Sequence, residues 1–249
     1  MSNDVNDTTS LSRLFHLNSE PWLNEQAKQS APFAQKSKSY PNADRVALPP
    51  TTAGPVNELA MSRRSVRAFQ DSPLPLTELA AVLRAGYMAL SPDPHAKDQK
   101  ILRRSTPSAG GLYPLELYVL VRNVEGLPKG VYHYDAIGDE LELLTTDDWE
   151  PAANNAFLTW QFVEYAPFVI CLGAVFERTQ TKYGPRGYRY ALLEAGHTAQ
   201  NLCLTAEEMN LSSLCLGGYY DSILNGIFSF SGEDEAIIYA VAFGRSATK

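Results

Sequence analysis

The chain has 249 residues, of which 45% are hydrophobic and 20% are charged, a composition typical of a folded globular protein. This composition excludes an intrinsically disordered or collagen-like chain. The 21 basic and 28 acidic residues give a net charge of −7, which argues against nucleic acid as a partner but leaves room for a local basic site that binds one anionic cofactor.

No segment has the length or pattern of a membrane anchor or a secretory signal. The longest apolar runs, such as 169–176, are much shorter than the roughly 20 residues that a membrane-spanning helix needs. Residues 1–10 lack the basic and then apolar pattern of a signal peptide. Cys171, Cys203 and Cys215 each lie in an apolar run without CxxC spacing. We therefore expect a cytoplasmic protein with buried, reduced cysteines, no membrane partner and no bound metal.

The first 55 residues differ from the rest of the chain. They contain five prolines between Pro32 and Pro55 and show no sustained hydrophobic period. This pattern predicts an irregular arm over residues 1–55, with one short helix near residues 22–27, that wraps a surface or a partner subunit. Residues 56–249 are predicted to form one domain.

The first elements of that domain are helical. Residues 58–62 predict a short helix that leads into the basic segment 63–69. A longer helix follows, with Thr77 as its N-cap and an apolar stripe at Leu79, Val82, Leu83 and Gly86. Residues 91–99 and 102–114 are rich in turn-forming residues and predict loops.

Strands dominate the middle of the chain. Alternation over 117–121, and the runs 131–134 and 140–144 around Ile137-Gly138-Asp139, predict a strand and a hairpin. A helix is expected over 151–165, and the continuous apolar run 168–176 predicts a central strand buried on both faces. The longest helix is predicted over 189–209, followed by strands over 214–216 and 236–243. The mixture indicates an α+β fold.

Common catalytic fingerprints are absent from the sequence, including GxGxxG, the P-loop, HExxH and GxSxG. The four histidines have no metal-ligand spacing. Three other segments combine residue types that suit an anionic, planar ligand, although each also has a plainer interpretation.

The first segment is Arg63-Arg64-Ser65-Val66-Arg67. If it is extended, Arg63, Ser65 and Arg67 project to one side and form an anion site, because arginine binds phosphate through a bidentate fork. A solvated charged turn is the alternative. The second segment, 107–114 (PSAGGLYP), has small residues that let a planar ligand approach the backbone, or it is a plain turn. The third, 182–190 (KYGPRGYRY), suits either an anionic ligand or a contact between subunits.

Together these segments resemble a known family. Residues 63–69 (RRSVRAF) are similar to the flavin-phosphate motif of the nitroreductase superfamily. Residues 107–116 and 130–135 (GVYHYD) narrow the resemblance to SagB-type dehydrogenases, which include flavin oxidases that convert azolines to azoles in ribosomally made peptides. Further matches are Lys182-Tyr183-Gly184, Arg189-Tyr190, Glu194-Ala195-Gly196-His197, Gln200-Asn201, 15–19 (FHLNS), Tyr40-Pro41 and Leu48-Pro49.

The resemblance implies a nitroreductase-like fold, with a central, mainly antiparallel sheet flanked by helices, and a homodimer that binds FMN in a cleft between subunits. By this resemblance, the phosphate and ribityl chain of FMN would contact Arg63, Arg64, Ser65 and Arg67, with Arg64 lying between the others, and Arg245 would also contact the phosphate. A loop from the other subunit, formed by Pro107, Ser108, Ala109 and Gly110, would lie on the isoalloxazine. Gly217 and Gly218 would lie near the ring. The family often has a second basic residue next to the position of Arg245, where this chain has glycine and serine.

Lys182 and Tyr183 match the Lys–Tyr pair implicated as catalytic in azole-forming members. Oxidation of an azoline removes a hydride equivalent, which flavin accepts, and a proton, which needs a base. Neither side chain is a base at neutral pH unless its surroundings favour the neutral lysine or the tyrosinate. The hypothesis is that one of the two is the general base and the other assists it.

Three functions remain open at this point. The first is an FMN-dependent azoline oxidase, reoxidised by O₂, that acts on a peptide or a small molecule. The second is an NAD(P)H-dependent nitro or quinone reductase. The third is a flavin-holding scaffold in a complex with a cyclodehydratase.

Overall fold

The computed structural model describes residues 11–21, 38–92 and 102–247. Its centre is a six-stranded antiparallel sheet with the order β7-β6-β4-β8-β10-β9. The six strands are β4 (Leu115–Val121), β6 (Gly130–Asp135), β7 (Glu140–Thr145), β8 (Phe168–Val175), β9 (Ser212–Leu216) and β10 (Glu235–Gly244). The predicted α+β fold with a mainly antiparallel sheet is confirmed.

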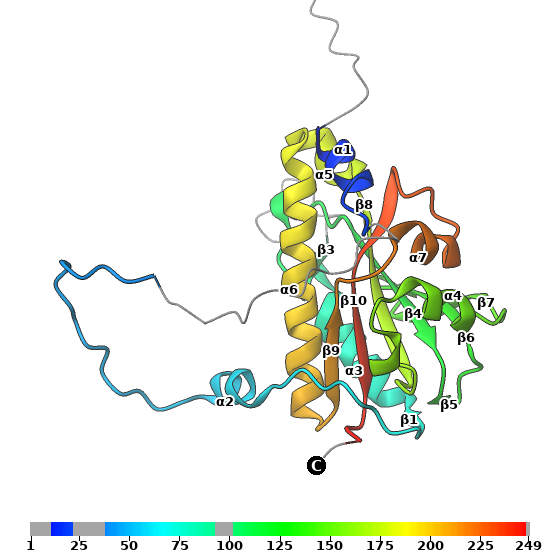
Figure 1. The fold of residues 1–249 in the computed structure, drawn as a ribbon, viewed down its shortest axis with the longest axis horizontal. Coiled ribbons are helices and arrows are strands. Elements are labelled where there is room, and N and C mark those ends of the chain that lie inside the picture. The colour runs from blue at the N-terminus through cyan, green and yellow to red at the C-terminus, as the bar shows by residue number, and fades with distance from the viewer. Residues whose placement is uncertain (1–10, 22–37, 93–101, 248–249) are drawn as a thin grey trace, which may run out of the picture.

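Helices cover both faces of this sheet (Figure 1). The helices are α1 (Leu11–Leu17), α2 (Pro55–Ser62), α3 (Leu76–Tyr87), α4 (Glu150–Ala156), α5 (Glu177–Tyr183), α6 (Arg186–Glu208) and α7 (Asp221–Ile227), with 3₁₀ turns η1 (Ala109–Gly111) and η2 (Trp160–Phe162). Two small sheets pair β1 (Leu74–Pro75) with β5 (Val124–Glu125) and β2 (Ala89–Pro92) with β3 (Leu102–Arg104).

The central strand β8 explains the two-layered core. Its side chains alternate between the faces of the sheet, as the pleat of a strand requires. Ile170 and Leu172 pack with the buried residues of α3 and α6, whereas Val169 and Cys171 pack with those of α4 and α7. Because both faces are covered by helices, every residue from 168 to 174 is buried, as the continuous apolar run predicts.

Several predicted boundaries are wrong for local reasons. The helix expected over 151–165 ends at Ala156, because Phe157 turns to pair with Tyr219 as a β-bridge. Thr77 is not an N-cap, since α3 begins at Leu76 and no side chain caps it. Helices α1 and α5 are not predicted by the sequence patterns, while the helix expected near residues 22–27 lies outside the described residues.

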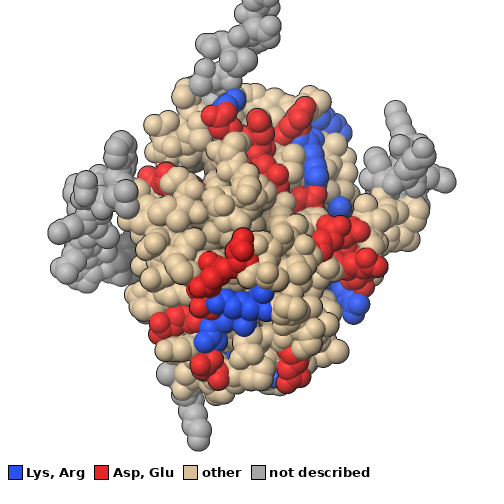
Figure 2. Space-filling view, turned by 90° about the vertical axis from the view of Figure 1, so that its right-hand side faces the viewer, with Lys and Arg blue, Asp and Glu red and all other residues tan. Residues whose placement is uncertain are grey.

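Some of the charged groups on the surface form ion pairs. On the face shown in Figure 2, basic side chains lie beside acidic ones. Arg122 pairs with Asp71 and Glu150, and Lys129 pairs with Asp148 and Glu150. Within the ranges that the structure describes, no helix is long and apolar enough to cross a membrane.

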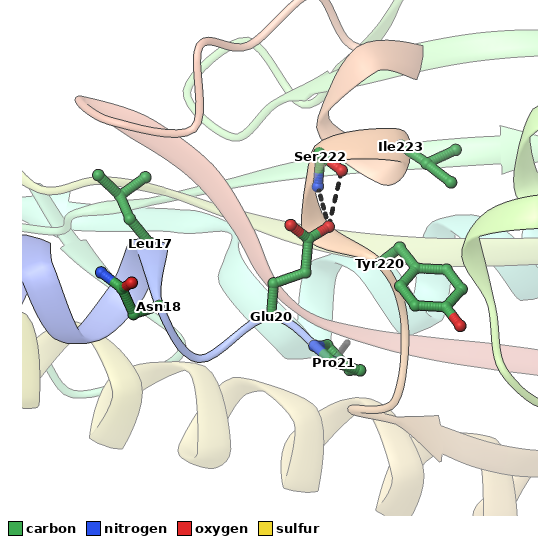
Figure 3. A pocket seen from close by; sticks show the side chains of 7 residues that line it. All are labelled: Leu17, Asn18, Glu20, Pro21, Tyr220, Ser222 and Ile223. Atoms are coloured by element: carbon green, nitrogen blue, oxygen red, sulfur yellow. Dashed lines mark hydrogen bonds between the residues drawn. The ribbon is translucent and has the colours of Figure 1, made fainter. Parts of the chain in front are cut away.

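Residues 11–21 of the N-terminal arm dock against the domain. His16 is buried, and its ring lies 3.2 Å from the Tyr188 hydroxyl. Just after α1, the Glu20 carboxylate accepts hydrogen bonds from the backbone N–H and the hydroxyl of Ser222, at 2.8 and 2.7 Å (Figure 3). Glu20 therefore joins the arm to the start of α7, whereas the segment 38–54 extends away from the domain (Figure 1).

The junction between α5 and α6 depends on Gly187. A β-carbon on Gly187 would lie 2.6 Å from the backbone of Thr179 and Gln180. We expect Gly187→Ala to lower the free energy of unfolding by about 1–3 kcal/mol, because two backbones would have to separate. Denaturant unfolding of the purified variant would measure the change.

Gly226→Ala is the matched control, since this exposed glycine of α7 has no atom within 4 Å of its β-carbon position. It is expected to be neutral or to stabilise the protein by up to about 1 kcal/mol. Equal stabilities of the two variants would contradict the close packing at Gly187.

Candidate functional site

The loop 107–111 meets the Lys182–Tyr183 pair within one chain. Gly110 has a φ of 66°, a conformation that favours glycine. A β-carbon there would lie only 2.5 Å from the Tyr183 hydroxyl and 2.8 Å from Lys182 Nζ. The positive φ therefore favours glycine at this position, and a larger residue would also require the ends of the Lys182 and Tyr183 side chains to move.

Helix α5 places the pair. Lys182 and Tyr183 form its last two residues, and Gly184 (φ of 56°) follows. The Lys182 ammonium lies 5.2 Å from the centre of the Tyr183 ring, which packs edge-on against Tyr190. Lys182 is exposed in the single chain, and Tyr183 is half-buried. The two polar groups thus face solvent beside the loop.

The buried carboxyl group of Glu194 lies near the loop 107–111. Glu194 of α6 is 2% exposed, and its Oε1 accepts a 2.6 Å hydrogen bond from the Tyr87 hydroxyl. Ser108 lies near enough to this carboxyl to lower its pKa, as Tyr87 does. Burial raises the pKa of Glu194 to about 7, although both hydroxyls act in the opposite direction. Glu194 therefore lies beside the loop and holds a proton near neutral pH.

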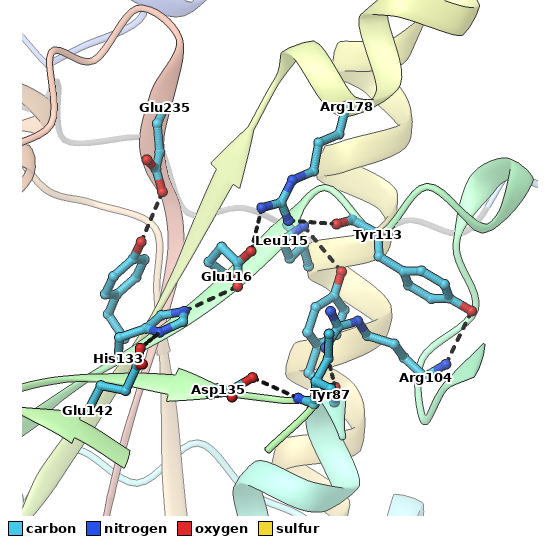
Figure 4. A network of polar contacts seen from close by, with 12 residues as sticks. Tyr87, Arg104, Tyr113, Leu115, Glu116, His133, Asp135, Glu142, Arg178 and Glu235 are labelled. Atoms are coloured by element: carbon cyan, nitrogen blue, oxygen red, sulfur yellow. Dashed lines mark hydrogen bonds and ion pairs between the residues drawn. The ribbon is translucent and has the colours of Figure 1, made fainter. Parts of the chain in front are cut away.

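Further hydrogen bonds fix the end of the loop at Tyr113 (Figure 4). The Tyr113 N–H donates to Ser108 Oγ at 2.9 Å, and its carbonyl accepts from Arg178 at 3.0 Å. Arg178 in turn pairs with Glu116 at 2.6 Å. The Arg104 N–H donates to the Tyr113 hydroxyl at 3.1 Å. Tyr113 has a φ of 46°, which is costly for a tyrosine, so these contacts hold the loop in one conformation.

Sequence reasoning did not find this supporting network. Glu194 was noted only as part of a motif, and the roles of Tyr87 and Arg178 were not predicted. The sequence feature that indicates a buried Glu194 is its position on the buried face of α6, three residues after Ala191 and one before Ala195. A charged residue on such a face needs partners, because an uncompensated buried charge is costly.

The basic segment 63–67 lies at a different place. Ser65 forms a parallel β-bridge with Ser213 of β9, and Phe69 bridges to Ser246 after β10. The segment is therefore extended, which is the condition under which Arg63, Ser65 and Arg67 project to one side, and it runs beside β9 and the end of β10. Arg63 Nη1 donates to Ser65 Oγ, and Arg67 Nη1 donates to the Ser65 carbonyl, each at 3.4 Å.

The arginines of this region differ in their partners. Within the described residues, Arg63 and Arg67 form no ion pair with a carboxylate, which fits a site for an external anion. Arg64 donates to three carbonyls at the end of α2, at 2.6–3.0 Å. Arg245 pairs with Glu78 at 2.6 Å and donates to the carbonyls of Met209 and Asn210, at the end of α6.

Gly217 and Gly218 directly follow β9 and are exposed. Gly217 borders a hollow that is also lined by Tyr188, Leu192 and Asp221. The two glycines thus follow the strand whose Ser213 contacts Ser65. Arg245, by contrast, contacts the residues just after α6, whereas the Lys182–Tyr183 pair directly precedes this helix. A helix of 23 residues is about 34 Å long.

Comparisons with known proteins identify the family. The family model described as "Nitroreductase family" matches residues 60–245. A putative nitroreductase of Methanocaldococcus jannaschii, MJ1384, is 35% identical over 73% of this chain and 88% of its own length. The microcin B17-processing protein McbC of Escherichia coli is 31% identical over 62% of this chain. The chain therefore belongs to the nitroreductase family.

A solved structure is similar as well. The E. coli microcin synthetase McbBCD complex with truncated pro-MccB17 bound contains a chain that matches 95% of this chain and 82% of its own length, with 26% identity and a TM-score of 0.60. In sequence, by contrast, the match to McbC spans only 57% of the length of that relative.

The raised pKa of Glu194 predicts a pH-dependent stability. Between pH 4.5 and about 7 the native carboxyl holds a proton that the unfolded chain releases, so burial of Glu194 costs stability as the pH rises, by up to about 3 kcal/mol above pH 7. Glu194→Gln cannot ionise and should gain stability relative to the wild type between pH 5 and pH 8. Denaturant unfolding of both proteins across that range measures this difference.

Asp221→Asn is the comparison variant, because burial raises the pKa of Asp221 to about 6. Its gain should be smaller and should be complete at a lower pH. A stability difference between Glu194→Gln and the wild type that does not change with pH would contradict a buried, protonated Glu194.

Proposed function

We propose that this member of the nitroreductase family is an FMN-dependent, SagB-type dehydrogenase that oxidises azoline rings to azoles in a ribosomally made peptide, with the flavin reoxidised by O₂. The observation that carries the proposal is the convergence of Lys182 Nζ and the Tyr183 hydroxyl on Gly110 of the predicted flavin loop. The similarity to McbC, a microcin-processing protein, and to the McbBCD complex supports a peptide substrate and a cyclodehydratase partner.

The donor set fits FMN. Arg63 and Arg67 offer guanidinium groups that are not neutralised by carboxylates, with Ser65 between them. The exposed backbone at Gly217 and Gly218 and the loop 107–110 would hold the ring. When bound, FMN supplies hydride acceptance. Arg64 and Arg245 are already engaged with carbonyls and Glu78, so their contribution to the phosphate site is expected to be smaller.

The chain's own task is then to orient the azoline and to remove a proton from its ring carbon. Lys182 and Tyr183 present the two groups able to accept it, 5.2 Å apart as measured from Nζ to the ring centre. Because Lys182 is exposed in one chain, its desolvation would come from the second subunit and the bound substrate.

We also propose a homodimer with a composite site. The basic group contacts the C-terminal end of α6 through Arg245, whereas the Lys182–Tyr183 pair directly precedes the N-terminus of that helix. One subunit would therefore supply Arg63, Ser65, Arg67 and Gly217, while the other would supply the loop 107–110 with Lys182 and Tyr183.

The catalytic assignment is tested by anaerobic mixing of FMN-loaded protein with an azoline-bearing peptide, with flavin bleaching as the readout. Lys182→Ala and Tyr183→Phe should retain FMN but slow bleaching by at least about 100-fold, because the proton acceptor or its assistant is lost. Near-normal bleaching in both variants would refute the assignment.

The same experiment distinguishes the alternative functions. Bleaching by NADPH or NADH but not by peptide would identify a nitro or quinone reductase, the class named for the 35%-identical relative. A third outcome is that neither the peptide alone nor a nicotinamide bleaches the flavin, but the peptide does so once a cyclodehydratase is added. This outcome would place the chain in an obligate complex. Absence of bleaching even then would favour a flavin-holding scaffold.

Arg63→Ala should weaken FMN binding by at least about 10-fold, since it removes a charge-assisted hydrogen bond worth roughly 1.5–3 kcal/mol. Arg64→Ala is the matched control, because the Arg64 guanidinium already donates to the end of α2. Titration of the protein with FMN, followed by flavin fluorescence, measures both affinities. Equal losses for the two variants would contradict the alternating arrangement.

The same Arg63 variant tests the composite site. A mixed dimer of Arg63→Ala and Lys182→Ala subunits has one intact site only if Arg63 and Lys182 act from different subunits. At an FMN concentration that the Arg63→Ala site does not fill, subunit exchange should then give a rate above that of either variant alone. No restoration, in a mixture shown to contain mixed dimers, would place both residues of a site on one subunit.

A further inference from the structure

Two of the three cysteines lie in contact, whereas the sequence predicted only that all three are buried and reduced. The sulfur atoms of Cys203, on α6, and Cys215, on β9, are 3.7 Å apart. Cys203 is 2% exposed, whereas Cys215 is exposed, which corrects the expectation that all three are buried. Cys171 is fully buried in the core layer beneath α4 and α7. The pair thus combines an accessible thiol with a protected one.

The surroundings of Cys215 favour its thiolate. The pKa of Cys215 is lowered by the hydrogen bond from Cys203, and further by a hydrogen bond with Tyr239 and by the positive charge of Arg63. The pKa of Cys203 is raised by the same contact and by burial. Since the thiolate is the reactive form of cysteine, Cys215 is the nucleophile of the pair and Cys203 keeps its proton.

We propose that Cys215 and Cys203 form a peroxide-reactive dithiol that closes to a disulfide between β9 and α6. The Cys215 thiolate attacks one oxygen of hydrogen peroxide, the O–O bond breaks, and a sulfenic acid and water result. The Cys203 sulfur then attacks Cys215, the S–O bond breaks, and a second water leaves. Two thiols lose two electrons and two protons in total, and the peroxide is reduced to two waters.

The step requires only a short movement. The two sulfur atoms must approach from 3.7 Å to about 2.0 Å, and both side chains lie between the same helix and strand. The two cysteines are 12 residues apart in sequence, so the disulfide would close a short loop around the turn between α6 and β9. This turn also carries the Met209 and Asn210 carbonyls that bind Arg245.

The position of the dithiol relates it to the proposed cofactor site, and this part rests on the proposed function. Ser213, Cys215 and Gly217 alternate along β9 and lie on one side of it. Ser213 bridges to Ser65, and Arg63 lies close enough to Cys215 to stabilise its thiolate. Bound flavin would therefore cover Cys215, while its reoxidation by O₂ would generate peroxide nearby. Loss of flavin would expose the thiol.

Oxidation of the full-length, flavin-free protein tests the dithiol. The protein is treated with hydrogen peroxide, denatured, labelled with N-ethylmaleimide and weighed by intact-mass spectrometry. The expected product carries one maleimide in place of three, and dithiothreitol restores three. Cys171→Ala is the matched control and should still lose two labelling sites. Three maleimides after peroxide, or a disulfide that involves Cys171 or a second chain, would overturn the proposal.

Single variants test the order of the two steps. Cys203→Ser should stop at a sulfenic acid on Cys215, which dimedone traps. Cys215→Ser should give no adduct, because Cys203 is buried. Dimedone on Cys203 but not on Cys215 would reverse the assigned roles and overturn the mechanism.

The last experiment tests how bound FMN changes the reactivity of Cys215. Saturating FMN should slow modification of Cys215 at least ~10-fold, because reactivity requires access to the thiolate. An unchanged rate with FMN bound would overturn the placement of Cys215 beneath the flavin. Failure to bind FMN would overturn the proposed function, while the mass measurement would still decide the dithiol.

Discussion

The carboxyl group of Glu194 is the interaction on which the arrangement of the loop depends. It lies on the buried face of α6, where it accepts a hydrogen bond from the Tyr87 hydroxyl and has Ser108 nearby. Tyr87 closes α3, and Ser108 begins the loop that meets Lys182, so one side chain connects a core helix to the candidate active site. One of its oxygens, Oε2, has no partner within the described residues, which is consistent with a carboxyl that keeps its proton near pH 7.

The sequence predicts the elements that have a long and regular hydrophobic period. The strand 168–175 and the helix 186–208 are examples, because burial of a continuous face leaves a pattern that local reading detects. The short helix α5 leaves no such pattern, since only Thr179 of its seven residues is buried. Lys182 and Tyr183 were consequently found through motif resemblance, whereas their position on a helix came only from the structure.

Contacts between distant segments explain the remaining differences. Cys203 and Cys215 are separated by a turn that reverses the chain, and neither apolar run indicates that their sulfur atoms meet. The sequence shows that Arg63, Ser65 and Arg67 alternate, but it does not show which groups the arginines bind. Arg64 and Arg245 bind carbonyls at the ends of α2 and α6, as cations near helix C-termini commonly do.

The negative net charge and the basic motif are compatible because acidic residues outnumber basic ones over the whole chain, while several cations outside the motif pair with carboxylates and Arg63 and Arg67 do not. Arg84, Arg122 and Arg178 each pair with a carboxylate, and exposed pairs of this kind contribute little to stability. Arg63 and Arg67 lack such a partner, so their charges repel one another unless an external anion binds between them. A phosphate at this position would remove the repulsion and gain bidentate hydrogen bonds. In the proposed phosphate site, the same anion would also lie near the Cys215 sulfur, whose pKa the charge of Arg63 lowers, and would disfavour its thiolate.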